Sequence, residues 1–205
     1  MRSTPLFVTA ALTLILAAAG CNKPNAAADT ANNAAATDSP AVAAAQDATA
    51  GAVGAVAAAA GALTTAGFVT GAATSDMYEV AAAKIAAHKS TNPEVKAFAT
   101  HMVHDHTAST AALKTILAGG VTATPPGAMD KRRDGLINNL NAAAPADFDK
   151  TYMDQQVAAH NEALTLFKGF ADHGDNDALK AFAAKTAPTI QAHLDMANQI
   201  DGAMK

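Results

Sequence analysis

The sequence predicts an all-α domain over residues 66–205, built as an up-down-up-down bundle of four long helices. Three observations lead to this fold class. Apolar and small residues recur at steps of three and four, no segment shows the alternation that strands need, and Gly or Pro residues separate the periodic segments. Two tight connections and one longer one are typical of such a bundle.

The first residues have the layout of a secretory signal peptide. Arg2 precedes an apolar run over residues 6–16 that is too short to span a bilayer as a mature helix. Small residues then lead into Cys21, the only cysteine of the chain, through the sequence Leu16-Ala17-Ala18-Ala19-Gly20-Cys21. This pattern resembles a bacterial lipobox, which implies removal of residues 1–20 and lipidation of Cys21. The alternative is ordinary cleavage nearby, with Cys21 incidental.

Lipidation of Cys21 would make the membrane a partner of this protein through its lipid anchor. We therefore expect a periplasmic location. Asn22, rather than Asp, follows the cysteine, and the resemblance to bacterial lipoprotein sorting signals implies the outer membrane over the inner one. Nucleic acid is not an expected partner, because the formal net charge is −4 and the only basic cluster is Lys131-Arg132-Arg133. The sequence does not indicate which proteins it contacts.

Residues 21–65 are predicted to form the lipidated end and a disordered, alanine-rich tether. Ala, Asn, Thr, Asp and Gly dominate this segment, and it contains no aromatic residue. Such a composition buries too little apolar surface to offset the entropy lost on ordering. The alanine content of residues 53–63 favours a transient helix, but Gly51, Gly54 and Gly61 disfavour its persistence.

Four long helices are predicted over residues 67–89, 93–118, 148–173 and 177–201. Asn92-Pro93 provides a cap and a first-turn proline for the second helix, and Gly119-Gly120 ends it. A short amphipathic helix over residues 129–141 lies between the second and third long helices. Its Lys131, Arg132 and Arg133 are expected to face solvent.

Each long helix places one ionisable residue on its otherwise apolar or small stripe. These residues are Glu79, His106, His160 and His193. Measured at 1.5 Å per residue, they fall in one layer within about two turns. Buried groups of this kind must satisfy one another or bind a cation. Three imidazoles and one carboxylate suit a divalent transition metal such as zinc, iron, copper or manganese.

The competing interpretation is a metal-free, hydrogen-bonded polar cluster that specifies helix register. Asp105, Tyr152 and Glu162 are expected to support the four residues as outer partners. The sequence thus leaves two functions open: a metal-binding envelope module and a non-catalytic structural or interaction protein. No serine or cysteine arrangement resembles a catalytic triad, so we do not expect an enzyme.

The motifs along the domain resemble those of the domain of unknown function 4142 family. They are Phe68-Val69, Ser75 to Glu79, His101 to Thr107, Phe148 to Tyr152, His160, Phe182-Ala183, Pro188-Thr189 and His193-Leu194. The resemblance implies a ferritin-like helical bundle that is usually exported and often lipidated, with no established activity. Its signature positions correspond here to Asp105, His106, His160 and His193.

One departure from ferritin-like di-iron proteins is visible in the sequence. Those proteins carry a Glu-x-x-His motif on each of two helices, and this chain contains none. A carboxylate-bridged di-iron centre is therefore disfavoured. A mononuclear site is the most that these ligands could support.

Overall fold

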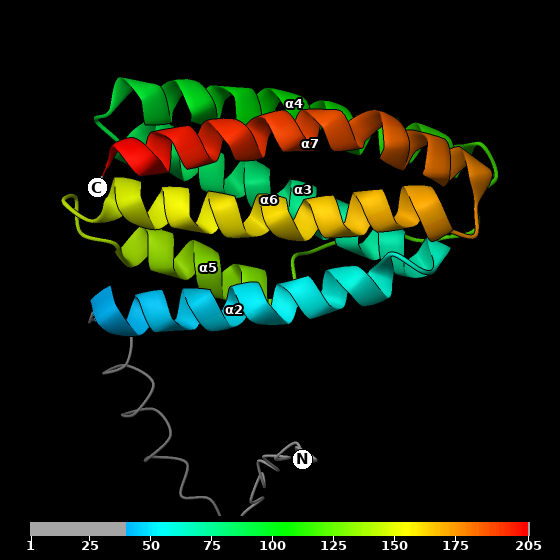
Figure 1. The fold of residues 1–205 in the computed structure, drawn as a ribbon, viewed down its shortest axis with the longest axis horizontal. Coiled ribbons are helices and arrows are strands. Elements are labelled where there is room, and N and C mark those ends of the chain that lie inside the picture. The colour runs from blue at the N-terminus through cyan, green and yellow to red at the C-terminus, as the bar shows by residue number, and fades with distance from the viewer. Residues whose placement is uncertain (1–39, 205) are drawn as a thin grey trace, which may run out of the picture.

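The computed structural model describes residues 40–204, which form six helices and no strand (Figure 1). The signal peptide, Cys21 and residues 22–39 of the predicted tether lie outside this range. An all-helical fold is therefore confirmed for the described residues. The helices are α2 Pro40–Gly61, α3 Thr65–Lys89, α4 Pro93–Ala118, α5 Lys131–Ala142, α6 Phe148–His173 and α7 Asp177–Ala203.

The helix boundaries from α3 onward agree with the predicted ones to within two residues, because local capping chemistry sets them. Oδ1 of Asn92 accepts a hydrogen bond from the backbone N–H of Glu94 at 2.9 Å, and Pro93 occupies the first turn of α4. Asn176 caps α7 in the same way, through the N–H of Leu179. Asp147, in contrast, precedes α6 without a side-chain cap.

The order of the long helices differs from the expected up-down-up-down arrangement. Thr65, at the start of α3, donates its backbone N–H to Asp175 in the α6–α7 turn at 2.8 Å. Lys89, at the other end of α3, donates to the carbonyl of Ala143 just before α6. The α3–α4 and α6–α7 turns therefore lie at opposite ends. That prediction was wrong, because residues 119–147 run back along the bundle and leave α4 and α6 parallel (Figure 1).

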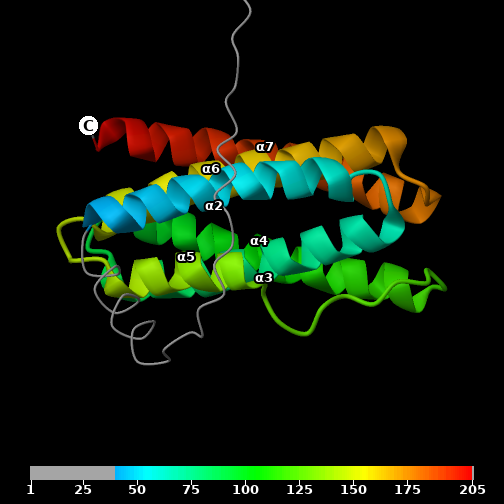
Figure 2. The same ribbon diagram turned by 90° about the horizontal axis from the view of Figure 1, so that it is seen from below.

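Residues 40–61 form helix α2, so the prediction of a disordered tether was wrong for this part of the chain. Figures 1 and 2 show α2 lying along α6, with α5 beside α3. Ala58 and Ala62 are 5% and 4% exposed on the inner side of this contact. A Cβ added to Gly169 of α6 would come within 2.8 Å of Ala62. Small side chains therefore let α2 approach α6 closely enough to bury its surface, which the composition of the segment did not predict.

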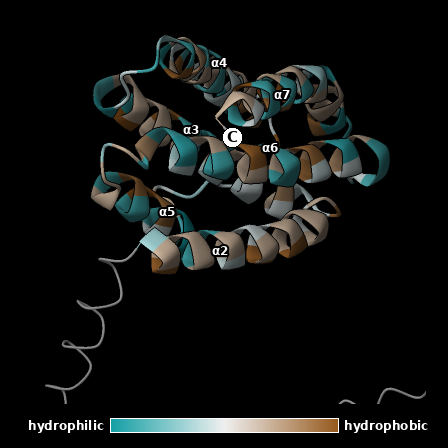
Figure 3. Cartoon of the chain, turned by 60° about the vertical axis from the view of Figure 1, so that its left-hand side comes forward, coloured by the Kyte–Doolittle hydropathy of each residue, from teal (hydrophilic) through white to brown (hydrophobic). Residues whose placement is uncertain are grey.

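Asp47 ties α2 to the rest of the molecule through hydrogen bonds. Its two carboxylate oxygens accept from the side-chain amides of Asn139 on α5 and Gln155 on α6, each at 2.6 Å. By length and composition alone α2 could cross a membrane. Figure 3 shows little hydrophilic colour along it. In this structure, however, its one charged side chain and its smallest residues face the bundle.

Gly51→Ala and Gly54→Ala provide a matched test of how α2 packs. A Cβ at residue 51 would meet the Cβ of Ala158 at an ordinary 3.6 Å, whereas one at residue 54 would overlap Oε2 of Glu162. We expect Gly51→Ala to raise the free energy of unfolding by about 1 kcal/mol through helix propensity. Gly54→Ala should not give this stabilisation, because Arg132 and Arg133 hold Glu162 where it would overlap the added methyl group. Equal stabilisation in urea titrations would contradict the α2–α6 contact.

The core consists of two apolar clusters separated by a polar layer. One cluster gathers Phe68, Phe167, Phe170 and Phe182 near the start of α3, where the rings of Phe68 and Phe170 stack at 4.3 Å. The other contains Phe98, Phe148 and Tyr152 toward the opposite end. On each long helix the predicted ionisable residue falls between members of the two clusters. Glu79, His106, His160 and His193 are all at most 6% exposed, as their stripes predicted.

Candidate metal centre

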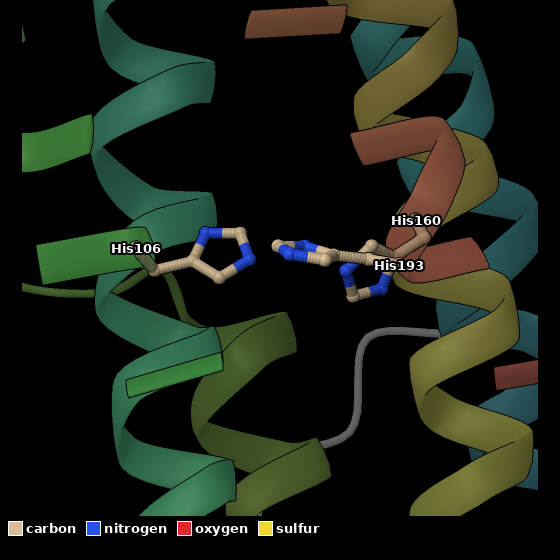
Figure 4. Close-up of side chains that lie close together, drawn as sticks. All are labelled: His106, His160 and His193. Atoms are coloured by element: carbon tan, nitrogen blue, oxygen red, sulfur yellow. The ribbon is translucent and has the colours of Figure 1, made fainter. Parts of the chain in front are cut away.

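Three histidines from three helices converge inside the bundle. His106 of α4, His160 of α6 and His193 of α7 point toward one another (Figure 4). Their ring centroids are 5.5 to 5.8 Å apart, and one ring nitrogen from each lies within 4.8 Å of the others. We call these residues the histidine triad.

In the observed helix order, the residues of the triad differ less in their position along the bundle axis than they would in the expected order. The end of α3, the starts of α4 and α6 and the end of α7 all lie at the same end of the bundle. Measured from there, Glu79 and the triad are about 10 to 13 residues along their helices, which corresponds to roughly 15–20 Å. The four residues therefore span about one turn.

Each ring of the triad is held by a hydrogen bond through one nitrogen. Nδ1 of His106 donates to Oδ1 of Asp76 at 2.9 Å, and Thr110 donates to the other oxygen of Asp76 at 3.0 Å. Nδ1 of His160 donates to the carbonyl of Gln156 at 2.8 Å. Nε2 of His193 donates to Oδ2 of Asp105 at 2.9 Å. These acceptors place the proton of each neutral imidazole on its outer nitrogen and leave the other nitrogen with a lone pair.

The second nitrogen of each ring has no hydrogen-bond partner among the described residues. These atoms are Nε2 of His106, Nε2 of His160 and Nδ1 of His193. Leaving a buried polar atom unsatisfied costs about 1–3 kcal/mol, so three such atoms side by side call for a common partner. Nitrogens that share a zinc-like ion at 2.0–2.1 Å lie no more than about 4 Å apart. One ring nitrogen from each histidine of the triad lies within 4.8 Å of the others, which is close to that limit.

The electrostatics of the triad favour neutral imidazoles at two of its three positions. Burial lowers the pKa of His160 to about 3, and the neighbouring charge of His106 acts in the same direction. Burial also lowers the pKa of His193, although its hydrogen bond to Asp105 opposes the shift. For His106, burial is outweighed by the hydrogen bond to Asp76 and by the charge of Glu79, so its pKa is raised. In its protonated form, which the raised pKa favours, His106 carries a proton on Nε2 that a bound cation would have to displace.

Glu79 lies beside the triad and does not belong to the group of three close ligand atoms. Its Oε1 is 3.9 Å from Nδ1 of His160, the nitrogen that already donates to Gln156. Burial raises the pKa of Glu79 to about 7, against the opposing influence of His106 and Gln156. Its Oε2 has no hydrogen-bond partner among the described residues. Glu79 thus adds an acidic neighbour that could approach an ion only by moving its side chain.

The three expected outer partners have different surroundings. Asp105 does hold His193, as described above. Tyr152 is fully buried beside Phe98, and its hydroxyl has no partner among the described residues. Burial raises the pKa of Tyr152 well above its usual value, so the hydroxyl stays protonated.

Glu162 lies away from the triad and accepts hydrogen bonds from Arg132 at 2.8 Å and from Arg133 at 2.5 Å. The expectation that both arginines face solvent was wrong for Arg133, which is 8% exposed. Glu162, Arg132 and Arg133 line a cavity of about 520 Å³ between α2, α5 and α6. No residue of the triad lines this cavity.

Two residues that hold the triad were not anticipated, namely Asp76 and Gln156. Asp76 precedes Glu79 by three residues, so the two carboxylates share one face of α3 and the spacing could have indicated it. The role of Gln156 lies in its backbone carbonyl, which faces the side chain of His160 one turn later. Every residue has a backbone carbonyl, so the identity of residue 156 could not have predicted this role.

Comparison with protein families gives one match, and it covers residues 50–200. The family is described as Domain of unknown function (DUF4142). The chain belongs to this family. The DUF4142 match contains the whole triad together with Asp76, Glu79 and Asp105, and it begins inside α2, which agrees with the packing of that helix onto the domain. No curated protein and no solved structure matches the chain.

Proposed function

We propose that this DUF4142 protein binds one divalent transition-metal ion through His106, His160 and His193. The observation that carries the proposal is the set of three ring nitrogens without a hydrogen-bond partner among the described residues, each on a ring fixed through its other nitrogen. Metal-binding histidines characteristically donate their second N–H to a carboxylate or a backbone carbonyl. In a metal-free cluster these nitrogens would instead accept hydrogen bonds from one another's N–H groups, from other donors or from buried water.

The ligand types narrow the choice of metal. Imidazole nitrogens suit zinc, copper, iron and nickel, whereas manganese favours carboxylate and water oxygens. Three nitrogens without a bridging carboxylate therefore favour zinc, copper or iron over manganese. A three-histidine set leaves a further coordination position, which Glu79 or a small molecule could fill. We propose binding or buffering of the metal as the function.

Elemental analysis of protein purified without a histidine tag tests this function. Protein from metal-replete growth is expected to contain about one transition-metal ion per chain. An absence of metal, with no binding of added zinc, copper or iron, would contradict the proposal. That outcome would favour the competing function, in which the layer sets helix register for a structural or interaction protein.

The proposed location of this metal site is the periplasmic side of the cell envelope, tethered by a lipid on Cys21. One long connection between two antiparallel helix pairs is typical of ferritin-like folds, which supports the proposed kinship with that fold. Such kinship indicates no activity by itself.

Cys21→Ser is expected to release the protein from the membrane fraction, because a serine cannot receive the thioether-linked lipid. The measurement is fractionation of cells that express the full chain, followed by immunoblotting. Ala17→Ser, a neutral change inside the same pattern, serves as the control and should leave the protein with membranes. Retention of the Cys21→Ser protein in membranes would overturn the proposed anchor.

A further inference from the structure

The groups that hold the triad differ sharply in their access to solvent. The side chain of Asp76 is 4% exposed and Gln156 is fully buried, whereas the side chain of Asp105 is 33% exposed. The triad itself is at most 6% exposed. Among the groups that hold its rings, Asp105 therefore offers an incoming ion the most accessible contact.

Asp105 also connects the buried triad to a surface histidine. Its Oδ2 accepts from Nε2 of His193 at 2.9 Å, and its Oδ1 accepts from Nδ1 of His104 at 2.7 Å. The side chain of His104 is 82% exposed. His101, one turn earlier on α4, is exposed as well, and its charge acts on His193. Two imidazoles and a carboxylate thus lie along α4 on the outer side of His193.

The ring of His193 stands between Asp105 and the interior of the site. Its Nε2 is engaged with Asp105, while its Nδ1 is the atom left for a metal. An ion that arrives from this side must first contact Asp105. It reaches the other two histidines only after the bond between Asp105 and His193 opens.

We propose that Asp105 and His104 form the entrance through which a divalent transition-metal ion reaches the triad. This inference rests on the metal-binding function proposed above. Carboxylate and imidazole are both ligands for such ions, so the pair can capture the ion while it still carries water. Capture displaces the proton that Nδ1 of His104 donates to Asp105, and this proton leaves to solvent. The ion then draws Asp105 away from His193 and frees that ring to turn.

The kinetics of cobalt(II) binding test this entrance, because the visible absorbance of cobalt reports its coordination by imidazole. Stopped-flow mixing gives the rates of loading, and competition with a chelator gives the rate of release. His104→Ala is the informative variant, since His104 does not contact the triad. A group that lies only on the path lowers both rates by the same factor and leaves the dissociation constant unchanged.

Asp105→Asn should slow loading as well, and it should also weaken binding by about 10–100-fold, because Asp105 orients His193. His173→Ala provides the matched control, since His173 is exposed at the end of α6. It should leave both rates unchanged.

The outcomes separate the entrance from the metal site. If the wild-type protein binds no cobalt, zinc or copper, the proposed function fails. If it binds metal and His104→Ala loads and releases at wild-type rates, the entrance is overturned while the site stands. If His104→Ala weakens binding by accelerating release alone, His104 helps to hold the ion, and the entrance is again overturned. A parallel fall of both rates supports the inference.

Discussion

His160→Ala is expected to remove most of the stabilisation that transition metals give this protein. His160 is 1% exposed, and its free Nε2 is one of the three donors of the triad. A ligand at 1,000 times its dissociation constant stabilises a folded protein by about 4 kcal/mol, and loss of one of three ligands should remove most of that gain. Thermal unfolding with and without zinc measures the effect.

His173→Ala, at an exposed position on the same helix, is the control for His160→Ala. It should keep the full zinc-dependent rise in Tm. The metal-free His160→Ala protein must first show cooperative unfolding, so that an absent shift reports the site and not a misfolded chain. His193→Ala extends the test to a second ligand. A wild-type response in both triad variants would contradict the metal site.

Phe68→Ala is expected to lower the free energy of unfolding by about 3–5 kcal/mol, the range for removing a buried aromatic ring. Phe68 is fully buried, stacks on Phe170 at 4.3 Å and contacts Phe167 edge-on at 5.1 Å. Removal of the ring leaves a cavity among residues of three helices that cannot collapse independently. The measurement is the urea midpoint at unchanged m-value.

Thr70→Ala, on the exposed side of α3, is the control for Phe68→Ala and should change stability by no more than about 0.5 kcal/mol. Because Phe68 lies in the cluster away from Phe98 and Tyr152, the surviving folded protein should still respond to zinc. A loss below about 1 kcal/mol would contradict the packing described here.

The positions of α3 to α7 could be predicted from the sequence because helix periodicity and capping are local. Asn92, Pro93 and Asn176 mark boundaries through contacts within a few residues. The inward stripes likewise predicted that Glu79 and the three histidines are buried. Such predictions succeed because a side chain's direction follows from its position in the helix.

The packing of α2 could not be predicted, because alanine and glycine bury little surface on their own. Their contribution depends on how closely a partner helix approaches, as Ala62 and Gly169 illustrate. The amino-acid composition indicates how much apolar area a segment has, but it does not indicate how closely two helices can pack. Asp47 also forms hydrogen bonds with Asn139 and Gln155, which lie 92 and 108 positions further along the chain. A local sequence pattern cannot predict such contacts.

The sequence by itself determined which apolar residues and which four ionisable residues line the inward stripes of the long helices, because a helical period assigns each residue to a face. Only the tertiary structure decided which of them meet. The path of residues 119–147 made α4 and α6 parallel, and that order brought His106, His160 and His193 to one height while Glu79 stayed beside them. Asp76 and Asp105 became partners of the triad through contacts between helices, which a single helix's periodicity does not contain.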